Sequence, residues 1–322
     1  MHTRTWSAWH RLCAALALTV GPAFLGAQPA NRDPERVRFV TDDIAHFWDA
    51  FDARATLGTT RALDSLYFGR ASDGLRDFRR LRLQDDAQFA RTVDRLAPYY
   101  ASTRSSIARI ATLEPELRAM LRRFVREYPE ANLPDVYFVV GRLSSGGTTA
   151  PSGLLIGAEM YGRTADSLLG APLSAWHRTV LRPVADLPGI VAHELVHVQQ
   201  TGGGGGTLLE RALREGIADF VGERMSGKNI NPSAQAYADQ HEADLWIEFR
   251  RDMLGSDPSR WLYDGNATAG RPADLGYVMG YRIARAWFAR QSDARVALTQ
   301  LLTLDGLDAA RRLVDESGYA PG

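Results

Sequence analysis

Apolar positions in the first part of the chain recur at helical spacing. Between about residues 37 and 128, apolar side chains return every three or four positions, which predicts helices. The stripes are Ile44, Phe47, Trp48 and Phe51, then Leu75, Phe78 and Leu81, then Leu117, Met120, Leu121 and Phe124. Glu114 and Glu116 stand in the first turn of the last of these helices, where they complement the helix dipole. We expect these stripes to form a helical core layer.

The pattern changes after Pro134, where strand-like runs replace the helical spacing. Residues 136–140 form a compact run of β-branched and aromatic side chains, and residues 154–158 resume the same character. The stretch from Gly141 to Gly153 between these runs is rich in turn residues. We therefore expect either a hairpin or a pair of sheet strands joined by a long loop.

Helical spacing returns after Asp186 and continues almost to the C-terminus. The expected helices lie near residues 187–200, 207–225, 233–254, 275–290 and 293–302. Many helices and few strands predict an α+β fold that is mostly helical, with one small sheet. No clean linker divides the chain. We therefore predict a single domain over residues 28–322, with a helical N-terminal part to about residue 130 and a core over about 131–322.

The first 27 residues have the layout of a cleavable secretory signal. Arg4 and Arg11 form a short positive region, an apolar stretch runs from Leu12 to Leu25, and cleavage is expected after Ala27. The alternative is that this segment stays uncleaved as an anchor. A signal peptide predicts an exported protein, either periplasmic or secreted, of a bacterial cell envelope.

Composition narrows the classes of partner and of chemistry. The 322 residues carry 38 basic and 38 acidic side chains, so no net field attracts nucleic acid. The one cysteine, Cys13, lies in the signal segment, which leaves the mature chain without disulfides or a thiolate nucleophile. Because no second stretch of about 18 apolar residues follows, we expect no integral membrane span in the mature chain.

Residues 193–197 read His-Glu-Leu-Val-His, the pattern HExxH. On a helix, positions i and i+4 share one face, so His193 and His197 can reach one metal ion together. Glu194 is rotated by about 100° from the first histidine. From there it is placed to act as a general base on an attacking water. We predict that the two histidines are ligands and that Glu194 is catalytic.

A catalytic zinc typically takes a third protein ligand, and the next helix offers one. Leu209, Leu213, Ile217, Phe220 and Val221 form the apolar stripe of that helix. Glu215 and Asp219 lie on another of its faces, and the glycines at 202–206 allow the chain to reverse before it. We predict Glu215 as the third ligand and Asp219 as the group that orients a ligand imidazole.

Two segments resemble known metallopeptidases. Val191-Ala-His-Glu-Leu-Val-His-Val-Gln-Gln200 and Arg214-Glu-Gly-Ile-Ala-Asp219 are similar to the gluzincins, in which HExxH supplies two ligands and a glutamate on the next helix the third. More specifically, the chain resembles predicted zinc-dependent proteases related to gliding-motility lipoprotein B. Leu275-Gly-Tyr-Val-Met-Gly-Tyr281 and Glu316-Ser-Gly-Tyr319 echo their C-terminal signature, so the resemblance covers roughly residues 130 to 320.

The chain departs from this family pattern in two ways. The lipidated cysteine of the gliding-motility relatives is missing. The five-glycine run at 202–206 is a further departure, and it predicts an unusually mobile loop beside the active site.

The resemblance implies zincin-like active-site helices, one Zn²⁺ per chain and a peptide or protein substrate. It also implies a sheet edge above the HExxH helix that holds an extended peptide, for which Gly153 to Tyr161 is the candidate. The alternative is that this run is a plain buried strand. Tyr277, and less favourably Tyr281, are candidate donors to the developing oxyanion. Alternatively, Gly276 and Gly280 only allow close helix packing, and the tyrosines belong to the core.

Two functions are therefore compared. The first is a zinc-dependent peptidase that uses Glu194 as its general base. The alternative is a non-catalytic, metal-stabilised binding or assembly protein of the cell envelope. An intact Glu194 favours the enzyme, because a structural metal site has no need of a base.

Overall fold

The computed structural model describes residues 30–83, 85–167, 171–202, 204–263 and 270–321. The expected signal peptide over residues 1–27 lies outside these residues. The chain is mostly helical and forms a single domain with one small mixed sheet, which confirms the predicted α+β class. No helix in the described part is long and apolar enough to cross a membrane.

The N-terminal part is a layer of helices, as its apolar stripes predict. Phe47 is fully buried at its centre, where its ring contacts Trp48, Phe51, Tyr67 and other aromatic rings. The α-helices are α1 (Asp42–Leu57), α2 (Thr59–Ala62), α3 (Asp73–Phe78), α4 (Asp86–Arg95), α5 (Ala97–Ile107) and α6 (Glu114–Glu127). Shorter 3-10 and π-helical turns are η3 (Pro34–Arg36), η4 (Leu63–Tyr67), η5 (Phe68–Arg70), η6 (Arg79–Leu83) and η7 (Ala108–Leu113).

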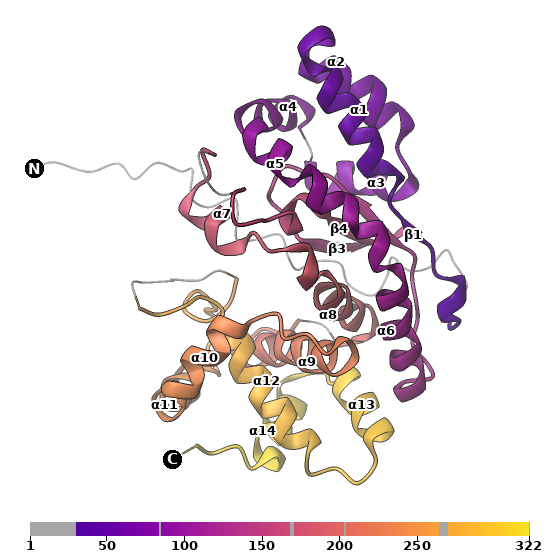
Figure 1. The fold of residues 1–322 in the computed structure, drawn as a ribbon. Coiled ribbons are helices and arrows are strands. Elements are labelled where there is room, and N and C mark those ends of the chain that lie inside the picture. The colour runs from indigo at the N-terminus through magenta and orange to yellow at the C-terminus, as the bar shows by residue number, and fades with distance from the viewer. Residues whose placement is uncertain (1–29, 84, 168–170, 203, 264–269, 322) are drawn as a thin grey trace, which may run out of the picture.

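The sheet has four strands in the order β1-β2-β4-β3, and it lies between the N-terminal helices and α8 (Leu187–Gln199) (Figure 1). The strands are β1 (Phe39–Val40), β2 (Val136–Val139), β3 (Gly147–Ala150) and β4 (Gly153–Gly157). β1, β2 and β4 are parallel, whereas β3 runs antiparallel to β4. Of the two arrangements expected, β2 and β4 are thus the pair of strands with a long connection, and that connection contains β3.

The edge of the sheet differs from the expectation. Gly153 to Tyr161 was the candidate edge, but β4 lies between β2 and β3 and is buried throughout, and a 3-10 turn, η8 (Ala158–Tyr161), follows it. The edge interpretation is wrong and the alternative, a plain buried strand, is confirmed for β4. An apolar run such as Leu154 to Ile156 suits a strand covered on both faces. The edge strand beside α8 is the polar β3.

The C-terminal part surrounds α8 and α9 (Leu208–Ser226) with further helices (Figure 1). They are α7 (Ala175–Val180), η9 (Val184–Asp186), α10 (Pro232–Gln240), α11 (Glu242–Asp252), α12 (Leu275–Phe288), α13 (Ala294–Leu302) and α14 (Leu307–Ser317). The helix expected over 233–254 is divided at His241, and neither α7 nor α14 is among the predicted helices. A capping box of Thr207 and Glu210 begins α9, as these residue types favour.

Glycines let α9 and α12 touch along their backbones. A β-carbon at Gly280 of α12 would lie 1.8 Å from the carbonyl oxygen of Ala212, and one at Gly216 of α9 would lie 2.2 Å from the backbone of α12. Gly280 therefore allows close helix packing, one of the two interpretations that the sequence leaves open. As a result α9 is buried on several sides, including the side that carries Glu215.

A buried carboxylate fixes the chain between β2 and β3. Both oxygens of Glu159 accept hydrogen bonds from the backbone, one from the N–H of Gly141 at 2.8 Å and one from that of Leu143 at 3.1 Å. Leu143 has a φ of 61°, a left-handed conformation that is uncommon for a leucine. Glu159 is fully buried and thereby orders the segment that leads into the edge strand.

We predict that Gly280→Ala destabilises the fold by about 3 kcal/mol or more, because the new methyl group has no space beside Ala212. Urea unfolding measures the change in the free energy of unfolding. Gly206→Ala is the matched control, since a β-carbon there meets no atom within 4 Å. An effect at Gly280 no larger than at Gly206 would contradict the packing argument.

We also predict that Glu159 makes the fold less stable at alkaline pH. Burial raises the pKa of Glu159 to about 7 from the ordinary 4.5, although its backbone hydrogen bonds act in the opposite direction. Because the folded state binds the proton more tightly, its contribution is complete below pH 4.5 and is lost as the pH rises through 7. Between pH 5 and 8 the wild type should lose about 2 kcal/mol more than Glu159→Gln. Urea unfolding at each pH measures the stability of both proteins. An equal loss of stability in the wild type and in Glu159→Gln between pH 5 and 8 would refute this role.

Candidate metal site

The two histidines of the HExxH pattern converge at one point. They lie one turn apart on α8, with their rings 4.7 Å apart and nearly perpendicular. Nε2 of His193 is 3.1 Å from Nε2 of His197. His193 is buried and His197 is half-buried. The structure thus brings two imidazole nitrogens to a single point, as the i, i+4 spacing requires.

Asp219 orients His193 through Nδ1, the ring nitrogen that does not face His197. Its Oδ1 lies 2.8 Å from Nδ1 of His193, and its Oδ2 accepts a hydrogen bond of 2.6 Å from Nδ2 of Asn231. Since a carboxylate only accepts, Nδ1 of His193 carries the proton and Nε2 is left as an acceptor. Asp219 therefore stands where the sequence places it. Asn231 was missed, because nothing in the pattern connects it with α9.

Gln200 holds His197 in the same way. Its Oε1 lies 2.7 Å from Nδ1 of His197, and its Nε2 donates to the carbonyl oxygen of Arg214 at 2.8 Å. The second contact fixes the orientation of the amide, so Nδ1 of His197 is the donor and Nε2 is again an acceptor. Sequence reasoning missed Gln200. Its position three residues after His197 is the signal that could have identified it.

Glu215 completes a triangle of acceptors. Its Oε2 lies 3.6 Å from Nε2 of His193 and 3.3 Å from Nε2 of His197. Ligands that surround a tetrahedral zinc at about 2.0–2.1 Å lie about 3.3–3.4 Å from one another. The three separations fit that geometry. Three lone pairs facing one another repel unless a cation lies between them, so these residues could hold a metal ion.

The surroundings of the triangle favour positive charge. Burial disfavours a charged imidazole, but without a metal ion the hydrogen bonds to Asp219 and Glu215 outweigh it and raise the pKa of His193 to about 10. A proton on Nε2 then takes the place between the acceptors that a metal ion would fill. Burial also acts to raise the pKa of Glu215, yet the two histidines lower it well below its ordinary range. The site therefore stabilises a cation and keeps the Glu215 carboxylate ionised, as a metal ligand must be.

Glu194 lies between the metal triangle and the edge strand. A β-carbon at Gly147 of β3 would lie 2.6 Å from Oε1 of Glu194, so only a glycine leaves room for this carboxylate. A β-carbon at the preceding Gly146 would lie 2.5 Å from the hydroxyl of Tyr161. Tyr161 itself is buried. Sequence reasoning missed both glycines, because they lie in the loop between the expected strands.

The candidate tyrosines take different positions. The ring of Tyr277 is roughly parallel to that of His193, with 6.5 Å between the centroids, so Tyr277 is brought to the site. Tyr281 instead contacts Phe220 and Arg285. A third tyrosine, Tyr263, was not considered in the sequence. Its buried hydroxyl has no hydrogen-bond partner in the described chain. Burial raises the pKa of Tyr263, and the negative charge of Glu215 raises it further.

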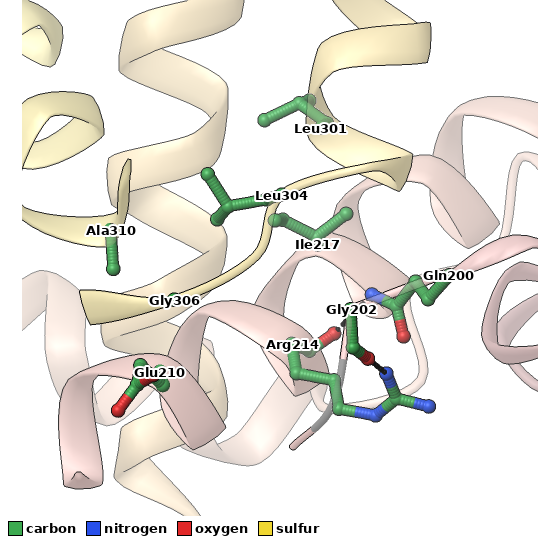
Figure 2. Close-up of a pocket in the computed structure, with 9 residues that line it drawn as sticks. All are labelled: Gln200, Gly202, Glu210, Arg214, Ile217, Leu301, Leu304, Gly306 and Ala310. Atoms are coloured by element: carbon green, nitrogen blue, oxygen red, sulfur yellow. Dashed lines mark hydrogen bonds between the residues drawn. The ribbon is translucent and has the colours of Figure 1, made fainter. Parts of the chain in front are cut away.

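Contacts of Gly202, the first residue of the glycine run, hold the backbone that follows α8. Arg214 donates to the carbonyl oxygen of Gly202 at 2.8 Å, and Figure 2 shows its side chain pointing there. A β-carbon at Gly202 would lie 2.2 Å from the carbonyl oxygen of Leu304. At this glycine the loop is therefore packed tightly, contrary to the mobility that the run suggests. Gly203 lies outside the described residues.

A pocket lies beside this loop (Figure 2). It is lined by Gln200, Gly202, Glu210, Arg214, Ile217, Leu301, Leu304, Gly306 and Ala310. None of the three acceptor residues lines it. The pocket therefore adjoins Gln200, which bonds His197, but does not include the metal triangle.

Comparison with known proteins identifies the same region. Residues 176–304, from α7 to the end of α13, match a family described as predicted Zn-dependent protease (DUF2268). The match includes HExxH and Glu215 but neither the sheet nor the N-terminal helices. No curated protein and no solved structure matches the chain. The link to gliding-motility relatives stays a prediction.

We predict that the protein binds about one Zn²⁺ per chain and that His193→Ala and Glu215→Ala abolish this binding. Asp219→Ala should weaken it about 10- to 100-fold, because the imidazole loses the group that orients it. Zinc content and competition with a chelator measure both effects. His241→Ala is the control, since that imidazole bonds the carbonyl oxygen of Tyr237 within its own segment. A wild type that stays free of metal after zinc is supplied would refute the site.

Proposed function

We propose that this protein is a zinc-dependent peptidase of the bacterial cell envelope. His193, His197 and Glu215 would hold one zinc, and Glu194 would act as the general base. The observation that carries the proposal is that the acceptor triangle and Glu194 lie together beside the open edge of a sheet. The family described as predicted Zn-dependent protease supports it.

The substrate would bind as an added strand. β3 pairs with β4 on one side only, so its other edge can offer backbone hydrogen bonds to an extended peptide. The peptide would then pass Gly147, beside which Glu194 stands. This register places a backbone carbonyl of the substrate near the base and the metal ligands.

The residues of this chain would perform the proton transfers. Zinc, when bound, supplies a Lewis acid that polarises the scissile carbonyl and makes water a stronger nucleophile. Glu194 takes a proton from the attacking water on its carboxylate and returns it to the nitrogen of the leaving amine. Tyr277 donates a hydrogen bond to the oxygen on which negative charge develops. Asp219 and Gln200 keep both imidazoles in the tautomer that presents Nε2.

The alternative, a non-catalytic binding or assembly protein, differs in what it requires of Glu194. A structural zinc is usually closed by four protein ligands, whereas the cluster found in the described chain consists of three residues. Gly147 leaves room for the Glu194 carboxylate beside the edge strand, where a general base would act on a bound peptide. We therefore favour the peptidase, exported by the N-terminal segment to the periplasm or outside the cell.

We predict that Glu194→Gln retains zinc and loses peptide hydrolysis at least about a hundredfold in kcat, because an amide cannot accept the proton from water. Cleavage of a mixed peptide library, followed by mass spectrometry, gives the activity. Glu130→Gln, an exposed change of the same kind, is the control. Unchanged activity in Glu194→Gln would exclude this mechanism.

A further inference from the structure

The loop between α9 and α10, residues 227–231, reaches the metal site through its last residue. Nδ2 of Asn231 donates a hydrogen bond of 2.6 Å to Oδ2 of Asp219. The other carboxylate oxygen of Asp219 lies 2.8 Å from Nδ1 of His193. Asp219 is buried, so removal of the Asn231 amide would take a hydrogen bond from an oxygen that is shielded from solvent. Asn231 thus stands next to the group that orients a metal ligand.

Asn231 does not perform the role that its position favours. It is the N-cap residue of α10, and an asparagine at an N-cap normally accepts a hydrogen bond from a backbone N–H of the first turn. The side chain of Asn231 makes no such capping bond. Its amide is turned toward α9, where it bonds Asp219. A residue that departs from a local preference in favour of a distant contact is expected at a functional site.

The amide of Asn231 is held in one orientation. Oδ1 of Asn231 lies 3.5 Å from Nη2 of Arg182, a long contact of the right polarity, so Nδ2 is the atom that faces Asp219. The backbone is held as well. The N–H of Asn231 donates to Oδ1 of Asn229 at 2.8 Å, and its carbonyl oxygen accepts from the N–H of Gln235 at 3.0 Å. Asn231 therefore presents a fixed donor to the carboxylate.

The loop is attached to both helices that carry the metal ligands. Nδ2 of Asn229 donates to Oε2 of Glu223 on α9 at 3.0 Å. On α8, a β-carbon at Gly189 would lie 2.7 Å from Cγ2 of Ile230, so only a glycine lets the loop pack there. Gly189 precedes His193 by four residues, which is about one helical turn. The position of the loop is thus set by the same two helices that bring the ligands together.

We propose that Asn231 is a positioning residue of the zinc site, which holds Asp219 in the orientation that fixes His193. A carboxylate that accepts on both oxygens cannot rotate without breaking one of its hydrogen bonds. The imidazole then keeps Nδ1 as its donor and presents Nε2 to the metal. This inference rests on the zinc site of the proposed function. It extends the support of that site to the α9–α10 loop, and it concerns metal binding rather than hydrolysis.

Zinc affinity tests the proposal. Asn231→Leu keeps a similar volume but has no donor, so it should weaken zinc binding about tenfold and no more than Asp219→Ala does. Competition with a chelator measures the affinity. Asn229→Asp is the matched control, because it removes the other bond between the loop and α9 and keeps the oxygen that accepts from Asn231. The control should bind zinc as the wild type does. An unchanged affinity in Asn231→Leu, or an equal loss in the control, would overturn the proposal.

A double variant shows whether Asn231 acts through Asp219. If it does, adding Asn231→Leu to Asp219→Ala should cause no further loss of zinc affinity, because the carboxylate to be positioned is already absent. A contribution of Asn231 that is independent of Asp219 would instead add its full effect. Thermal unfolding of the metal-free variants checks that each one is folded. An additive loss in the double variant would overturn the proposal.

Cobalt in place of zinc gives a signal from His193 itself. The proton NMR spectrum of the Co²⁺-loaded wild type should contain a metal-shifted signal from its Nδ1–H, which Asp219 protects from exchange with solvent. In Asn231→Leu this proton should exchange faster, whereas the corresponding proton of His197, held by Gln200, should not change. Equal exchange of the His193 proton in both proteins would overturn the proposal. If the wild type binds metal and cleaves no peptide, the peptidase proposal alone fails, whereas a wild type that binds neither metal would overturn this inference too.

Discussion

The arrangement of this domain depends on three acceptor atoms held in mutual contact. The imidazoles of α8 cannot turn away from each other, because Asp219 and Gln200 bond the far nitrogen of each ring. Glu215 is brought against them by α9, which packs closely on α8 and α12. The repulsion among these acceptors is a local cost that the surrounding fold sustains. Such a cost is common at functional sites, where the scaffold overrules local preference.

Much of this site could be predicted from the sequence because its geometry is local. Helical periodicity fixes the relative directions of His193 and His197, and it separates Glu215 and Asp219 by one turn. The apolar runs likewise predicted β2 and β4. A pattern of four or five residues is enough for each of these conclusions, since no distant contact decides them.

The features that sequence reasoning missed depend on contacts between distant segments. β3 becomes the edge strand because β4 pairs with β2, across a connection that contains β3 itself. Whether Tyr277 or Tyr281 faces the histidines depends on how α12 rotates against α9, and an amphipathic stripe does not decide it. Arg82 in η6 lies 66 residues before Thr148 in the chain, and the fold alone brings its Nη2 within 2.6 Å of Oγ1 of this β3 residue. Residue types alone carry no signal for such approaches.

The close backbone contact between α9 and α12 also has a consequence for biosynthesis. A ribosome releases the chain from its N-terminus, so the HExxH helix and Glu215 are made well before Gly280. Until α12 arrives, α9 lacks the surface against which Ala212 and Gly216 pack, and the third acceptor has no fixed position. A nascent or truncated chain would therefore contain every ligand without a formed site. The order of synthesis itself delays the formation of the acceptor triangle until the domain is nearly complete.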